Sequence, residues 1–131
     1  MSGLRKVMPE EASGDTLQTS GMVRRAGVSW STVGASKIWM GETHMAPGTV
    51  SGAHHHGDNE TAIYVVAGNP VFIHMADGVE ERIATKPGDY VYVPPFVPHI
   101  ESNEHSADEA VVVIARSSQE AIVENLDSLV P

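Results

Sequence analysis

The chain has 131 residues, which suits one domain with a single hydrophobic core. It contains no cysteine, so disulfides, thiolate metal sites and a cysteine nucleophile are excluded, and any metal must be held by nitrogen and oxygen ligands. Acidic residues outnumber basic ones 17 to 8, and no apolar run suits a membrane span or a secretory signal. We therefore expect a cytoplasmic protein that binds neither nucleic acid nor membranes.

In chain order, residues 1–20 are polar and small, which predicts an N-terminal arm that packs on another subunit. From residue 21 to residue 131, short apolar runs alternate with turn residues, and this pattern predicts a single β-barrel domain. The predicted strands cover residues 35–45, 62–67, 70–76, 80–84, 89–93 and 109–115. The clearest hairpin joins two of these strands across Ala76-Asp77-Gly78. Residues 118–129 could form either a helix or a last strand. The fold class is all-β.

Histidines dominate one short segment, His54-His55-His56-Gly57-Asp58-Asn59-Glu60. Alternate side chains of a strand leave the same face about 6–7 Å apart, so His54 and His56 can share one metal ion. Glu60 lies just beyond the next bend and offers a carboxylate. His99 follows a strand that ends at a proline-rich corner, which could return a third imidazole to the same place. The sequence therefore predicts a metal site.

These histidines lie in two segments with regular glycine spacing. The first runs Gly48, five residues, His54-His55-His56, three residues, Glu60, seven residues, Gly68. The second runs Gly88, five residues, Pro94, Pro95, Phe96, two residues, His99, three residues, Asn103. Together the two segments resemble the paired motifs of the cupin family. The resemblance implies a double-stranded β-helix, a jelly-roll barrel, with a divalent metal near its mouth held by His54, His56, Glu60 and His99.

The chain departs from the family pattern at two positions. Phe96 replaces a glycine of the second motif, which alters the corner before His99. Glu60 lies one residue too far from Gly68, and counting back from Gly68 puts Thr61 in the glutamate position. Either a bulge moves Glu60 to the metal, which we expect, or the site has three histidines. Three neutral imidazoles would leave the ion its full double charge, whereas a carboxylate would halve it.

A second group of side chains could act on a substrate. Tyr64 has the same strand parity as Glu60, so its hydroxyl could reach the cavity and move protons, although a structural barrel tyrosine fits as well. Asp58 and Glu101 could act as general acid or base if they face the mouth. By parity, His55 points to the opposite face from the predicted ligands.

The resemblance and the ligand set together favour a metal-dependent enzyme that acts on a small organic molecule. Many single-domain cupins are dioxygenases, and histidine–carboxylate sets suit Fe(II), with Mn, Ni, Cu or Zn as alternatives. Oxidative chemistry is therefore the first expectation. A Lewis-acid isomerase, lyase or polyketide cyclase is the alternative, and a non-catalytic barrel that binds a small molecule is the third. We also expect a homodimer, because pairing would cover exposed strand edges.

Overall fold

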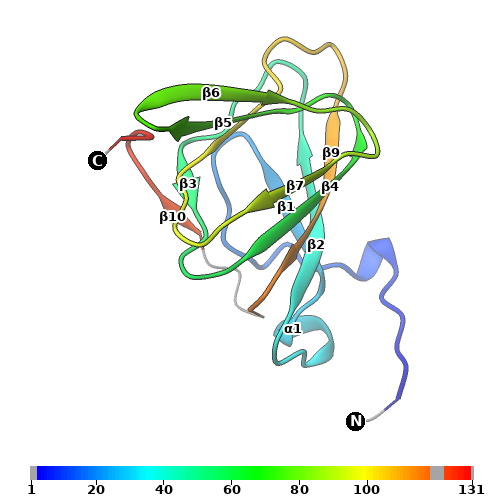
Figure 1. Ribbon diagram of the computed structural model, residues 1–131. Helices are drawn as coiled ribbons and strands as arrows, with labels where there is room; N and C mark the ends of the chain where they lie inside the picture. Colours follow the sequence, from blue (N-terminus) through cyan, green and yellow to red (C-terminus); the bar gives the residue numbers. More distant parts are fainter. Residues whose placement is uncertain (1–2, 119–122, 131) are drawn as a thin grey trace.

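The computed structural model describes residues 3–118 and 123–130 and is built almost entirely of β-strands (Figure 1). The five-stranded sheet has, in spatial order, β1 (Val23–Val28), β2 (Trp39–Met45), β9 (Ala110–Arg116), β4 (Thr61–Ala67) and β7 (Tyr90–Val93). The three-stranded sheet has β6 (Val79–Ala84), β5 (Val71–Ala76) and β8 (Ile100–Ser102). A two-stranded pair joins β10 (Glu124–Asn125) to β3 (His54–His55). The neighbouring strands are antiparallel, and the all-β prediction is confirmed.

The predicted strands agree with observed ones to within one residue at each end, with one exception. The predicted strand 35–45 begins only at Trp39, because the preceding turn of helix α1 (Trp30–Val33) ends at Gly34 in a left-handed conformation. The sequence did not reveal β1, which contains two arginines, or the two- and three-residue strands β3, β8 and β10. In the tail, residues 119–122 lie outside the described part of the chain.

The core lies on the inner face of the large sheet, where side chains alternate with strand parity. On β4, Thr61, Ile63 and Val65 are buried, whereas Ala62 and Tyr64 are exposed. This alternation of period two is what one buried sheet face requires. The main cluster of buried apolar side chains consists of Ala26, Trp39, Ile63, Val65, Phe72, Val93, Val112 and Ile114.

The corner between β7 and β8 brings the second histidine segment back to the first. Phe96 adopts a left-handed backbone conformation with a φ of 61°, which explains why the family pattern has glycine here. The Phe96 N–H donates to the carbonyl of Gly57 at 2.7 Å, and this bond ties the corner to the turn after His56. The corner therefore holds His99 opposite β3.

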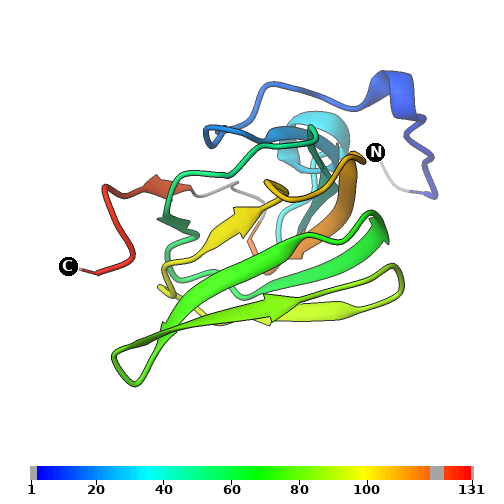
Figure 2. The ribbon, with the colours of Figure 1, turned by 90° about the horizontal axis from the view of Figure 1, so that it is seen from above.

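The N-terminal segment runs along the side of the barrel opposite the β5–β6 hairpin (Figure 2). It contains a short 3-10 helix, η1 (Pro9–Glu11), and then contacts β1 of its own chain. Ser13 and Ala26 exchange two backbone hydrogen bonds, and the Gln18 amide bonds the backbone N–H and C=O of Arg24. Residues 13–19 thus cover β1. Within the described residues, no helix is long and apolar enough to cross a membrane.

Candidate metal centre

Three histidines from two distant segments converge inside the barrel. His54 and His99 form an antiparallel bridge, and His56 follows β3 directly. One nitrogen atom of each ring lies within 4.8 Å of one nitrogen of the other two, and all three residues are buried. The ring centroids of His54 and His99 are 4.3 Å apart, and that of His56 lies 5.1 Å and 5.2 Å from them. The predicted three-imidazole arrangement is therefore present.

Backbone carbonyls orient two of these rings. His54 Nδ1 lies 2.9 Å from the Gly52 carbonyl oxygen, and His99 Nδ1 lies 3.0 Å from that of Val97. A carbonyl can only accept, so each Nδ1 carries a proton. The Nε2 of His54 contacts two buried charged side chains, which are described below. His99 Nε2 is buried and has no hydrogen-bond partner. A divalent ion would satisfy this atom, so the residues present fit a metal.

The protonation state of His99 also suits a ligand. Burial, followed by the proximity of His54, lowers the pKa of His99 to about 4. The imidazole is therefore neutral near pH 7, which is the form that binds metals.

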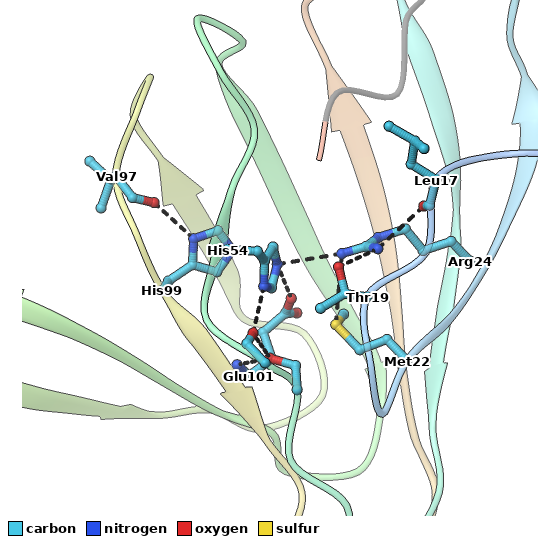
Figure 3. Close-up of polar contacts among 10 residues, drawn as sticks. Leu17, Thr19, Met22, Arg24, His54, Val97, His99 and Glu101 are labelled. Atoms are coloured by element: carbon cyan, nitrogen blue, oxygen red, sulfur yellow. Dashed lines mark hydrogen bonds and ion pairs between the residues drawn. The ribbon is translucent and has the colours of Figure 1, made fainter. Parts of the chain in front are cut away.

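Two buried charged side chains flank His54 (Figure 3). Glu101 Oε2 lies 3.6 Å and Arg24 Nη2 lies 3.4 Å from His54 Nε2, and the exposed fractions of Glu101 and Arg24 are 2% and 0%. Burial lowers the pKa of Arg24, whereas the Glu101 charge opposes that shift. Burial alone would raise the pKa of Glu101, but His54, His99 and Arg24 outweigh it and the pKa is lowered. The sequence suggested Glu101 only as a residue at the mouth, but the structure buries it beside His54.

Glu60, predicted as the carboxylate ligand, is not brought to the histidines. Its side chain is exposed, and its Oε2 accepts a hydrogen bond of 2.6 Å from the Tyr92 hydroxyl. Asn59 is buried instead and donates from Nδ2 to the carbonyl of His56 at 3.0 Å. The turn formed in this way puts Thr61, with an exposed fraction of 1%, at the first inward position of β4. The spacing counted back from Gly68 therefore identifies Thr61 as the inward residue. The bulge that we expected does not bring Glu60 to the histidines.

Tyr64, predicted as a catalytic residue, lies on the outer face of β4. Its exposed fraction is 38%, and its ring lies 4.9 Å from that of Tyr90 on the neighbouring strand β7. Because β4 turns Thr61, Ile63 and Val65 inward, Tyr64 shares the parity of exposed Ala62 and does not face the core. Asp58 is likewise exposed.

An apolar pocket reaches the metal centre from one side. It has a volume of about 360 Å³ and lies between β5, β7 and the corner that follows β7. His99 is a lining residue, together with the apolar side chains of Phe72, Ile73, Ile83, Val91, Val93 and Val97. His74 and Tyr92 also line it, and a mostly apolar hollow with a few polar groups is typical of a site for a small organic molecule.

Sequence analysis missed two buried arginines, Arg24 and Arg116, whose exposed fractions are 0% and 2%. Arg116 ends the apolar run of β9 at the same parity as buried Val112 and Ile114. An arginine at an inward position of a buried strand is a usable sequence signal, because arginine is seldom fully buried without a reason. Arg24 in β1 gave no such signal, since its strand was not predicted.

A family model described as "Cupin domain" matches residues 41–115, more than half of the chain. This chain belongs to the cupin family. A search of curated proteins finds no match. Among solved structures, oxalate decarboxylase from Bacillus subtilis aligns with a TM-score of 0.72 at 16% identity, over 86% of this cupin and 29% of that chain. This cupin thus spans less than a third of the decarboxylase, for which Mn(II) centres are described.

Two further structures share the fold at a similar distance. A protein with a double-stranded β-helix domain from Klebsiella pneumoniae has a TM-score of 0.65 and 17% identity, over 86% of this cupin and 91% of that chain. Peruvianin-I from Thevetia peruviana, described as a cysteine peptidase, has a TM-score of 0.71 and 14% identity, over 88% of this cupin and 76% of that chain. Identities this low show the fold alone, and they confirm the predicted double-stranded β-helix.

Proposed function

We propose that this cupin is a metal-dependent enzyme that acts on a small organic molecule, with oxidative chemistry on Fe(II) as the leading class. The observation that supports it is the convergence of His54, His56 and His99, with the buried lone pair of His99 Nε2 left unpartnered. Leaving such an atom unsatisfied costs stability unless a ligand binds there. Three protein ligands also leave positions open for a substrate, as a catalytic rather than a structural site requires.

A bound ion would supply Lewis acidity and, if it is redox-active, electrons for dioxygen chemistry. The chain's own contribution is positional. Gly52 and Val97 fix the two imidazole orientations through their carbonyls. The apolar pocket beside His99 excludes water and orients a substrate toward the site. Buried Glu101, whose pKa is lowered, offers an ionised carboxylate that can accept a proton close to His54.

A Lewis-acid isomerase, lyase or cyclase is the second candidate, and the neutrality of the donor set favours it. Because Glu60 lies outside the histidine group, the three converging residues themselves are uncharged as ligands, and the nearest described carboxylate is that of Glu101, 3.6 Å from His54 Nε2. A less neutralised divalent ion polarises a substrate oxygen more strongly. The oxygenase proposal remains ahead because open positions next to imidazole ligands also suit Fe(II).

Elemental analysis of the purified protein, beside a His99→Ala variant, tests the proposal. A His74→Ala variant is the matched control, since His74 lies in β5 and bonds Glu81 at 3.0 Å outside the histidine group. We expect about one iron per chain in the parent and the control, and less than a tenth of that in His99→Ala. Zinc at this level would favour the Lewis-acid class. No metal after reconstitution with each candidate ion would overturn both enzyme proposals and leave a binding barrel.

We further propose that the protein is a homodimer to which the N-terminal arm contributes. Leu4 is fully exposed and Met8 is 40% exposed, so apolar side chains of the arm lack a cover within the described chain. Deletion of residues 1–12 spares the bonds of Ser13 and Gln18 to β1. We expect sedimentation to show a dimer for the full chain and a weaker dimer for the deletion. An unchanged dimer would exclude the arm from the interface.

A further inference from the structure

Arg116 places an unpaired charge inside the barrel. Its exposed fraction is 2%, and among the described residues neither Nε, Nη1 nor Nη2 has a hydrogen-bond partner. The guanidinium lies over the Trp39 ring, with Cζ 4.5 Å from the ring centroid. Three guanidinium nitrogen atoms without a hydrogen-bond partner are unusual in a buried arginine, because burying a charge without a partner destabilises the fold. An arrangement of this kind is typical of a site that binds an anion.

The polar groups around Arg116 form one cluster on the inner face of the large sheet. Register puts Arg116 of β9 between Trp39 of β2 and Thr61 of β4. The Thr61 hydroxyl is also buried without a partner. Thr61 takes the position that the family motif gives to a glutamate. A glutamate there would repel a bound anion, whereas the neutral Thr61 hydroxyl can donate a hydrogen bond to it. Asn59 Oδ1, two residues earlier, is unpartnered as well.

The charges in this interior sum to one positive excess. Arg24 and Glu101 both lie against His54, and their opposite charges offset each other. Among the described residues, Arg116 has neither a hydrogen-bond partner nor an ion-pair partner for its guanidinium. Burial and then the charge of Arg24 lower the pKa of Arg116 to about 9, whereas the charge of Glu101 opposes that shift. The interior therefore favours a ligand with one negative charge. A ligand with two negative charges would be repelled by the Glu101 carboxylate.

We propose that Arg116, with Thr61, binds the carboxylate of a small organic monoacid inside the barrel. A planar guanidinium presents paired N–H groups that match the two oxygen atoms of a carboxylate. The Thr61 hydroxyl can donate to the same group. We expect the apolar remainder of such a molecule to extend toward the pocket beside His99, because Thr61 pairs in register with Val93, which lines that pocket. This inference names the substrate class for the proposed metal enzyme and rests on that function only for its catalytic meaning, because the anion site itself needs no metal.

Calorimetric titration of the metal-free protein, prepared with a chelator, tests the site with benzoate as probe and benzamide as its neutral isostere. We expect benzoate to bind and benzamide to bind at least tenfold more weakly. Arg116→Met should lose at least tenfold in benzoate affinity, and Thr61→Val should lose severalfold. Arg82→Met is the matched control, because Arg82 pairs with Glu80 and Glu104 on the surface, and it should bind benzoate as the parent does.

Thermal unfolding separates recognition from a structural role. If the charge is held in place for a ligand, Arg116→Met should unfold at a higher temperature than the ligand-free parent, and benzoate should raise the midpoint of the parent alone. A lower midpoint for Arg116→Met together with unchanged benzoate affinity would overturn the proposal. Equal affinity of the parent for benzoate, inorganic phosphate and chloride would also overturn it, since the site would then lack carboxylate recognition.

The two proposals fail in different ways. If the parent protein binds benzoate but no metal, the proposed metal enzyme is refuted and the carboxylate site stands. Metal binding without benzoate binding, in a parent that is folded by circular dichroism, would refute the carboxylate site and keep the metal centre.

Discussion

The backbones of His54 and His99 hold each other by two reciprocal hydrogen bonds. The His54 N–H donates to the His99 carbonyl at 3.1 Å, and the His99 N–H donates to the His54 carbonyl at 2.9 Å. Because the pairing uses main-chain atoms only, the two imidazoles are brought together by the barrel and not by a metal. The fold by itself therefore brings the candidate metal ligands together, and the side chains can be changed one at a time.

From this pairing we expect His54→Ala to lose metal while the protein stays folded. His55→Ala is the matched control, since His55 lies next in the chain, is only half-buried and accepts a hydrogen bond on Nδ1 from the Gly57 N–H. Metal content by elemental analysis should fall at least tenfold in His54→Ala and stay near the parent level in His55→Ala. Equal loss in both variants would point to a damaged β3 strand instead of a lost ligand.

The position of Glu60 gives a second prediction. We expect Glu60→Gln to change metal affinity by less than twofold, because its carboxylate bonds Tyr92 on the exposed side. Removal of a true ligand or of its direct support typically costs tenfold to a hundredfold. Competition with a chromogenic chelator measures the affinity. A tenfold loss of metal affinity in Glu60→Gln would show that Glu60 is a metal ligand after all. In the same assay Thr61→Glu, which restores the family residue at the inward position, should bind the ion more tightly than the parent.

The charges beside His54 predict a coupling between Arg24 and Glu101. No direct ion pair joins them within the described residues, yet each contacts His54, and both are buried. Glu101→Gln should lower the free energy of unfolding by about 3 kcal/mol, because it leaves buried guanidinium charge without compensation. Arg24→Met combined with Glu101→Gln should recover part of that loss. Urea unfolding in the presence of a chelator measures both, and additive losses would show that the two charges act independently.

A tight backbone approach at Gly41 gives a prediction about the fold. A Cβ atom at Gly41 would overlap the Arg25 carbonyl oxygen and come within 2.7 Å of the Trp39 ring. Gly41→Ala should therefore lower the free energy of unfolding by about 1–3 kcal/mol. Gly27→Ala is the control, since its Cβ would meet only the Met40 carbonyl oxygen at 3.5 Å. Equal unfolding midpoints for the two variants would show that β1 and β2 can move apart.

The sequence by itself determined the sheet-forming segments and the identity of the three histidines. Alternation and turn residues located β4, β5, β6, β7 and β9 because a strand with one buried face has a period of two. The strands it missed are too short or too polar for that pattern, and what makes them strands is a partner distant in sequence. β3, for example, pairs with the two-residue strand β10 and, at His54, with His99.

Only the tertiary structure decided which neighbouring residues face the metal centre. Spacing alone left Glu60 and Thr61 as alternatives, and the buried turn at Asn59 with the register of β4 turned Thr61 inward. The same holds for the buried charges of Arg24, Glu101 and Arg116, which lie on three different strands. Side-chain direction is set by hydrogen bonds to other strands, and burial is set by packing between sheets, so neither property is contained in the local sequence.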